Sequence, residues 1–162
     1  MAFDRHTVFG AILVAIVVAA VIAGIAITGG PGEARKQKED RARLEALTET
    51  ARALACYHQS IGAIPEDLSL VEEEFAHAAS GVRGLRLCHT AAMRPDPITH
   101  EAFRLKRSDG KVTHICADFA TSSPETPYYL YNEVIVVAPG LGEARKAPGE
   151  QCYELNLDAE LK

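Results

Sequence analysis

The chain has 162 residues, of which 48% are hydrophobic, 24% are charged and 6% are aromatic. Such a chain is too apolar to be disordered and too charged to cross a membrane many times. Its net charge of -5 and its lack of a basic block argue against binding to nucleic-acid phosphates. The length suits one domain with a short appendage.

An uncharged apolar stretch runs from Val8 to Thr28, after a short N-terminal tail at residues 1–7. As a helix it would span roughly 32 Å at ~1.5 Å per residue, enough to cross a hydrocarbon core of ~30 Å. A cleaved signal peptide would have an apolar run of only about 7–15 residues and a more basic front. The sequence therefore predicts an uncleaved transmembrane helix at residues 8–28.

Small side chains recur four residues apart along this predicted helix, at Ala11, Ala15, Ala19 and Ala23. In lipid, such a row lets the backbone of a second helix approach closely. Alanine is also common in membrane helices generally. Two interpretations therefore stay open, which are packing against another transmembrane helix and composition alone.

The charges and the cysteines favour opposite sides of the membrane for the rest of the chain. Five basic residues follow the apolar stretch, namely Arg35, Lys36, Lys38, Arg41 and Arg43. The positive-inside rule would place them in the cytoplasm. Four cysteines in a small domain instead favour an oxidising compartment, and long domains translocate largely regardless of flanking charge. We expect a bacterial inner-membrane protein with its domain in the periplasm.

A hinge and a long helix are predicted after the apolar stretch. Residues 29–43 begin with Gly29-Gly30-Pro31-Gly32 and continue with interleaved acidic and basic side chains, which predicts a break and then a solvated juxtamembrane helix. Apolar residues at intervals of three or four extend the helical pattern over residues 33–60, and Gly62 ends it. Residues 44–162 are expected to form the folded domain.

Short strands and turns are predicted after a second, shorter helix at residues 68–79. Alternating side chains predict strands at residues 82–88, 102–107, 111–119 and 151–157. The segment Ser108-Asp109-Gly110 is typical of a hairpin turn. Alternation along 111–119 places Val112 and Cys116 on one face and Ile115 and Phe119 on the other. The domain is therefore predicted to be α+β, with a long amphipathic helix packed on a small antiparallel sheet.

No motif in the sequence indicates catalysis or a cofactor. Phosphate-binding glycine loops, nucleophile elbows, haem-attachment motifs and zinc-knuckle spacings are absent. The acidic run Glu72-Glu73-Glu74 would point in different directions on a helix, so a solvated face explains it better than a metal site. Asp96 lies between two prolines, where a turn explains it. We expect a non-catalytic protein that binds no metal, cofactor or small-molecule substrate.

A tyrosine-rich segment is the strongest candidate for a partner-binding loop. Tyr128, Tyr129 and Tyr131 lie close together beside Pro127. Tyrosine is enriched at binding hot spots. A loop that packs over the sheet would explain the same residues equally well.

Two segments resemble those of a known architecture. The stretch from Tyr57 through Gly62-Ala63-Ile64-Pro65-Glu66-Asp67-Leu68 is similar to the Tyr…Gly-x-x-Pro-x-x-Leu segment of type IV pilin-like proteins and type II secretion pseudopilins. The stretch from Asp96 to Phe103 resembles the Asp-Pro-x-Thr-Gly-x-x-Tyr segment of small anchored proteins with that architecture, with His100 in place of the glycine. The resemblance implies a pilin-like fold behind a single membrane helix.

The same resemblance implies a disulfide pattern. Segments 114–121 and 151–155 are similar to the paired cysteine strands of these proteins, which implies a bond between Cys116 and Cys152. Cys56 would then pair with Cys88. Four cysteines allow three connectivities, and the resemblance favours this one.

The N-terminal region departs from that of true pilins and pseudopilins. They carry a basic leader, then Gly-Phe and a glutamate within the apolar run, whereas here no glutamate precedes Glu33. We therefore expect a structural or accessory subunit of an inner-membrane complex, respiratory or photosynthetic for example, whose partners are lipid and other transmembrane helices. The alternative is a pseudopilin-like component of a type II secretion or type IV pilus system.

Overall fold

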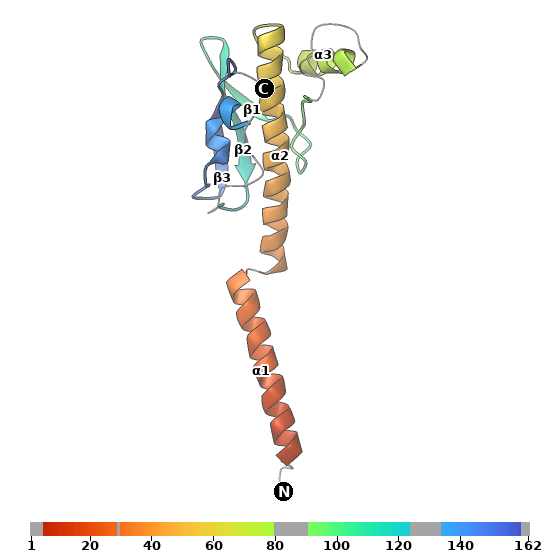
Figure 1. Ribbon diagram of the computed structural model, residues 1–162, viewed down its shortest axis with the longest axis vertical. Helices are drawn as coiled ribbons and strands as arrows, with labels where there is room; N and C mark the ends of the chain where they lie inside the picture. Colours follow the sequence, from red (N-terminus) through yellow and green to blue (C-terminus); the bar gives the residue numbers. More distant parts are fainter. Residues whose placement is uncertain (1–4, 29, 80–90, 124–133, 160–162) are drawn as a thin grey trace. The chain divides into compact units, whose positions relative to one another are not determined.

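The computed structural model describes residues 5–28, 30–79, 91–123 and 134–159 (Figure 1). The chain divides into two compact units, Met1–Lys36 and Gln37–Lys162. The long helices are α1 (Arg5–Thr28) and α2 (Pro31–Ser60), followed by the shorter α3 (Ser69–Ala79) and the single turn α4 (Val134–Val137). With three antiparallel strands, these elements confirm an α+β fold.

Helix α1 is apolar on every side. Its described side chains, those of residues 8–24, are all exposed, and Phe9 keeps 70% of its surface accessible. Within the part of the chain that the structure describes, no helix has both the length and the apolar character of a membrane span.

Helix α2 begins within the predicted hinge. Pro31 opens the helix, where its missing N–H costs no hydrogen bond. The carbonyl oxygen of Gly30 accepts the N–H groups of Glu33 and Ala34 at 2.9 and 3.3 Å. Gly32, predicted to lie in the hinge, is therefore helical.

The apolar stripe of α2 forms the centre of the hydrophobic core, as the sequence predicts. Leu44, Leu47 and Leu54 are at most 1% exposed and cluster with buried residues of the sheet. Burying a leucine side chain contributes about 1.5–3 kcal/mol. The helix ends before Gly62, whose φ of 122° confirms its predicted role as the left-handed cap. In Figure 1 the part of α2 that belongs to the second unit runs along the sheet.

The sheet has the order β1-β2-β3 and is antiparallel throughout. Its strands are β1 (Arg104–Ser108), β2 (Lys111–Phe119) and β3 (Gly149–Glu154). Asp109 and Gly110 join β1 to β2 with φ angles of 51° and 76°. Two positive φ values are what a tight two-residue hairpin requires, so the predicted turn is confirmed.

One prediction about β2 is wrong, because the strand contains a bulge. Lys106 pairs with His114 and Arg107 pairs with Val112, which leaves Thr113 opposite no residue of β1. An extra residue shifts the alternation of the side chains. Val112 and Ile115 are therefore both buried in the core, although strict alternation placed them on opposite faces.

The remaining predicted elements have mixed outcomes. The strand predicted at 82–88 lies outside the described residues. The last strand begins two residues earlier than predicted and ends at Glu154, yet Leu155 and Leu157 beyond it are still buried in the core.

Candidate functional site

A buried polar cluster joins α2 to two distant loops. Arg43 donates from Nη1 to Asp40 at 3.3 Å and from Nε to Asp96 at 2.5 Å. Asp40 also accepts the N–H groups of Ala120 and Thr121, at 2.9 and 2.7 Å, and the hydroxyl of Thr121 at 2.6 Å. The expectation of a fully solvated helix at residues 29–43 is therefore wrong at Asp40 and Arg43, which are only 1% and 7% exposed.

Asp96 shapes the turn that follows it. Its Oδ1 accepts the N–H groups of Ile98 and Thr99 at 2.8 and 3.4 Å, so the predicted turn role is confirmed. Burial alone would raise the pKa of Asp96, but the hydrogen bonds from Arg43 and from these two N–H groups outweigh it and lower the pKa. Asp96 is therefore held as a carboxylate and has a structural role.

His100 completes the same turn in a conformation that favours glycine. Its φ is 61°, and its N–H donates to the carbonyl oxygen of Asp96 at 2.8 Å. This is the position at which the pilin-like segment usually has glycine. In the sequence, the only sign of this backbone conformation is that a histidine stands where the resembled motif has glycine.

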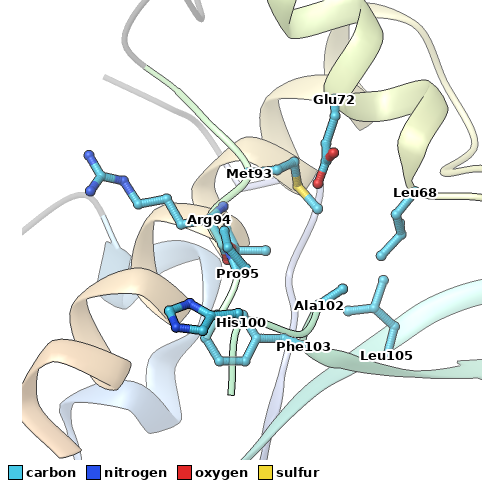
Figure 2. Close-up of a pocket in the computed structure, with 10 residues that line it drawn as sticks. Leu68, Glu72, Met93, Arg94, Pro95, His100, Ala102, Phe103 and Leu105 are labelled. Carbon is cyan, nitrogen blue, oxygen red and sulfur yellow. Dashed lines mark hydrogen bonds between the residues drawn. The ribbon is translucent and has the colours of Figure 1, made fainter. Parts of the chain in front are cut away.

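A hollow of 290 Å³ lies where α3 meets the segment that leads into β1. We call it the Glu72 hollow. Its apolar lining consists of Leu68, Met93, Pro95, Ala102, Phe103 and Leu105. Its polar lining consists of Thr50, Glu72, Arg94 and His100. Figure 2 shows Leu68 and Glu72, from α3 and the residue before it, gathered with side chains from residues 93–105.

At the hollow, the residues that the structure describes cover the core incompletely. Leu68, Met93 and Leu105 are only partly buried while they pack against the core. Phe103, which also lines the hollow, is 6% exposed. The volume is just below the ~300 Å³ at which typical small-molecule pockets begin, so the space suits one or two side chains better than a cofactor.

The polar side chains of the hollow differ in whether they have hydrogen-bond or ion-pair partners among the described residues. Thr50 accepts the N–H of Arg94 at 3.0 Å and donates its hydroxyl to the carbonyl oxygen of Arg94 at 2.9 Å. The guanidinium of Arg94 forms an ion pair with Glu49 and points away from the apolar side chains in Figure 2. Glu72 forms no ion pair within the described residues, and its carboxylate points towards Met93 in Figure 2.

The disulfide between Cys116 and Cys152 is confirmed. The two residues are direct partners on β2 and β3, with their Cα atoms 4.0 Å apart. Glu150 lies close to both sulfur atoms, but sulfurs joined to each other offer no thiolate ligands to a metal ion.

The second predicted disulfide stays a prediction. Cys88 lies outside the described residues, so a bond between it and Cys56 is not described. Among the described cysteines none is a free thiol, and these include Cys56.

The other sites predicted from the sequence remain open. Ala11, Ala15, Ala19 and Ala23 are all exposed on α1, so their packing against another helix stays a prediction. The segment with Tyr128, Tyr129 and Tyr131, predicted to bind a partner, lies outside the described residues. Glu72, Glu73 and Glu74 are exposed, as expected of a solvated helical face. No sequence pattern indicates the Glu72 hollow, since its lining comes from four separate segments.

No protein family, no curated protein and no solved structure matches the chain. The likeness to pilin-like proteins therefore rests on the short segments given above.

Proposed function

We propose that this protein is a non-catalytic, single-pass accessory subunit of an inner-membrane complex, with its folded domain in the periplasm. The observation that carries the proposal is the exposure of large apolar side chains on every side of α1. Val14, Ile16 and Ile22 each keep more than 60% of their surface accessible. A helix that is apolar all round belongs in a hydrocarbon or protein interior.

The length of α1 agrees with a membrane anchor. Its 24 residues would extend about 36 Å at ~1.5 Å per residue. A hydrocarbon core requires about 20 apolar residues. The described side chains, 8–24, fall short of that number, while the sequence stays uncharged from Val8 to Thr28.

The non-catalytic part of the proposal is supported by the groups whose pKa is shifted. The pKa of Asp96 is lowered within the buried cluster, and that of Asp67 is lowered by hydrogen bonds from the side chain and then the backbone of Ser69. Burial raises the pKa of Tyr153, which packs edge-to-face with Phe119 in the core. Each of these pKa shifts is explained by contacts that stabilise the fold, whereas the shifted pKa values of catalytic groups usually occur within a cleft.

The periplasmic location is supported by the disulfide. A bond between Cys116 and Cys152 persists in an oxidising compartment and is rare in the cytosol. Protease added to intact spheroplasts should therefore digest residues 37–162 and leave α1 in the membrane. Protection of the domain in spheroplasts, with digestion only after lysis, would contradict this orientation, and release of the chain by alkaline carbonate would contradict the anchor.

A pseudopilin-like role is the second candidate. The left-handed conformation of His100, at the position of the usual glycine, and the packing of α2 on a small antiparallel sheet favour it. A pseudopilin is cleaved ahead of its apolar helix, so its mature chain would lack Met1 and the tail behind it. The intact mass of the chain from its native membrane distinguishes the two roles.

A further inference from the structure

We propose that the Glu72 hollow receives an arginine or lysine side chain of a partner polypeptide. The aliphatic stem would fill the apolar space, and the charged end would meet the carboxylate of Glu72. The assignment of the cation to a partner protein rests on the proposed accessory role. The preference of the hollow for a cation does not rest on that role.

The apolar part of the hollow suits the stem of a long basic side chain. Leu68, Met93 and Leu105 leave apolar surface accessible although they pack on the core. The space of 290 Å³ can hold a chain of a few methylene groups. Lysine and arginine bury such stems along apolar surfaces and keep their charge at the edge.

The charges around the hollow select a cation. Arg94 is already paired with Glu49, and its guanidinium points away from the apolar group in Figure 2. Glu72 has no ion-pair partner in the part of the chain that the structure describes, and Glu73, the next residue, is paired with His77 at 3.5 Å. Among the described residues that line the hollow, the negative charge of Glu72 is therefore the one without an ion-pair partner.

Methionine provides a local probe of the hollow. The chain has two methionines, Met1 and Met93, so selective ¹³C-methyl labelling gives two signals, one of which reports on the hollow. The full chain would be studied in lipid nanodiscs and titrated with 1-butylguanidinium, with 1-butanol and with butyrate. The signal of Met1 shows whether a compound acts through the bilayer instead.

The proposal expects a saturable shift of the Met93 signal with butylguanidinium, a weaker one with butanol and none with butyrate. Glu72→Gln should lower the affinity for butylguanidinium by about threefold to fivefold, the range of exposed ion pairs, and leave the response to butanol unchanged. Glu74→Gln is the matched control, because it removes the same charge from the same helix at a residue that does not line the hollow.

Three results would overturn the proposal. These are an equal response to butanol and butylguanidinium, a response to butyrate, and equal effects of Glu72→Gln and Glu74→Gln. Leu105→Ala provides a second test, because a smaller apolar wall should weaken the binding of butylguanidinium and butanol alike. None of these results depends on whether the chain belongs to a membrane complex.

Discussion

Arg43 Nε and Asp96 Oδ2 lie 2.5 Å apart, although 53 positions separate the two residues in the sequence. Their side chains are only 9% and 10% exposed, so this is a buried, charge-assisted hydrogen bond. The same arginine also donates to Asp40, which accepts from Thr121 just after β2. Two side chains of α2 therefore together hold the Asp96 turn and the segment after β2 in place.

Replacing Arg43 with methionine should destabilise the domain by about 3–5 kcal/mol, because two buried carboxylates would lose their cation. Thermal unfolding of the full chain, followed by near-ultraviolet circular dichroism of the tyrosines, measures the change. Arg41→Met is the control, since Arg41 is exposed on the same helix, and it should cost less than about 1 kcal/mol. Equal losses for the two variants would contradict the role of the cluster.

Acid should destabilise the domain partly through Asp96. The pKa of Asp96 is below its ordinary value of 3.8 in the folded chain, so the carboxylate stabilises the fold above that value. The contribution is lost as the pH falls through the folded pKa. Stability measured from pH 5 downward should therefore fall less steeply in Asp96→Asn than in the unmodified chain. Parallel curves would show that Asp96 is not linked to acid unfolding.

The burial of Asp40 and Arg43 could not be predicted from the sequence. The run that contains Asp40 and Arg43 is polar on all sides, and polarity of that kind predicts a solvated helix. Both residues are buried because Asp96 and Thr121 satisfy them from segments far along the chain. A pairing of that range leaves no periodic or local pattern in the sequence.

Local sequence patterns, by contrast, were sufficient to predict a helix and a hairpin. Apolar residues at intervals of three or four predicted α2, and Asp109-Gly110 predicted the hairpin that the structure contains. The bulge at Thr113 was not predictable, because alternation assumes one residue opposite one residue. The Glu72 hollow was missed for a similar reason, since it depends on how α3 sits beside Met93 and Leu105.

The conformation of His100 predicts an unusual order of stability. At a φ of 61°, a glycine avoids the steric cost that a side chain with a Cβ atom incurs. His100→Gly should therefore be more stable than His100→Ala by about 1 kcal/mol. The same pair of substitutions at exposed Glu101 is the control for the general effect of glycine. An alanine variant at His100 as stable as the glycine variant would contradict a left-handed conformation in solution.

Loss of the Cys116–Cys152 bond should weaken the domain. The bond closes a loop of 36 residues, so replacing both cysteines with serine should cost about 2–4 kcal/mol. Unfolding in denaturant under non-reducing conditions measures this loss. A double variant with unchanged stability would indicate that β2 and β3 are held by their ladder and the core alone.

Peptide mapping tests whether that bond exists in the cell. Chain alkylated in intact membranes before extraction should give a linked peptide that contains Cys116 and Cys152. The same map reports whether Cys56 is joined to Cys88, as the resemblance implies. Full alkylation of Cys116 without reduction would contradict both the bond and the periplasmic location.

Gentle purification from the native membrane, followed by mass spectrometry of the intact chain and its stoichiometric partners, distinguishes an accessory subunit from a pseudopilin. For an accessory subunit we expect an uncleaved N-terminus and co-purification with an energy-transducing membrane complex. A chain cleaved before its apolar helix and found with secretion or pilus proteins would make it a pseudopilin. A chain recovered without any stoichiometric partner would contradict the accessory role.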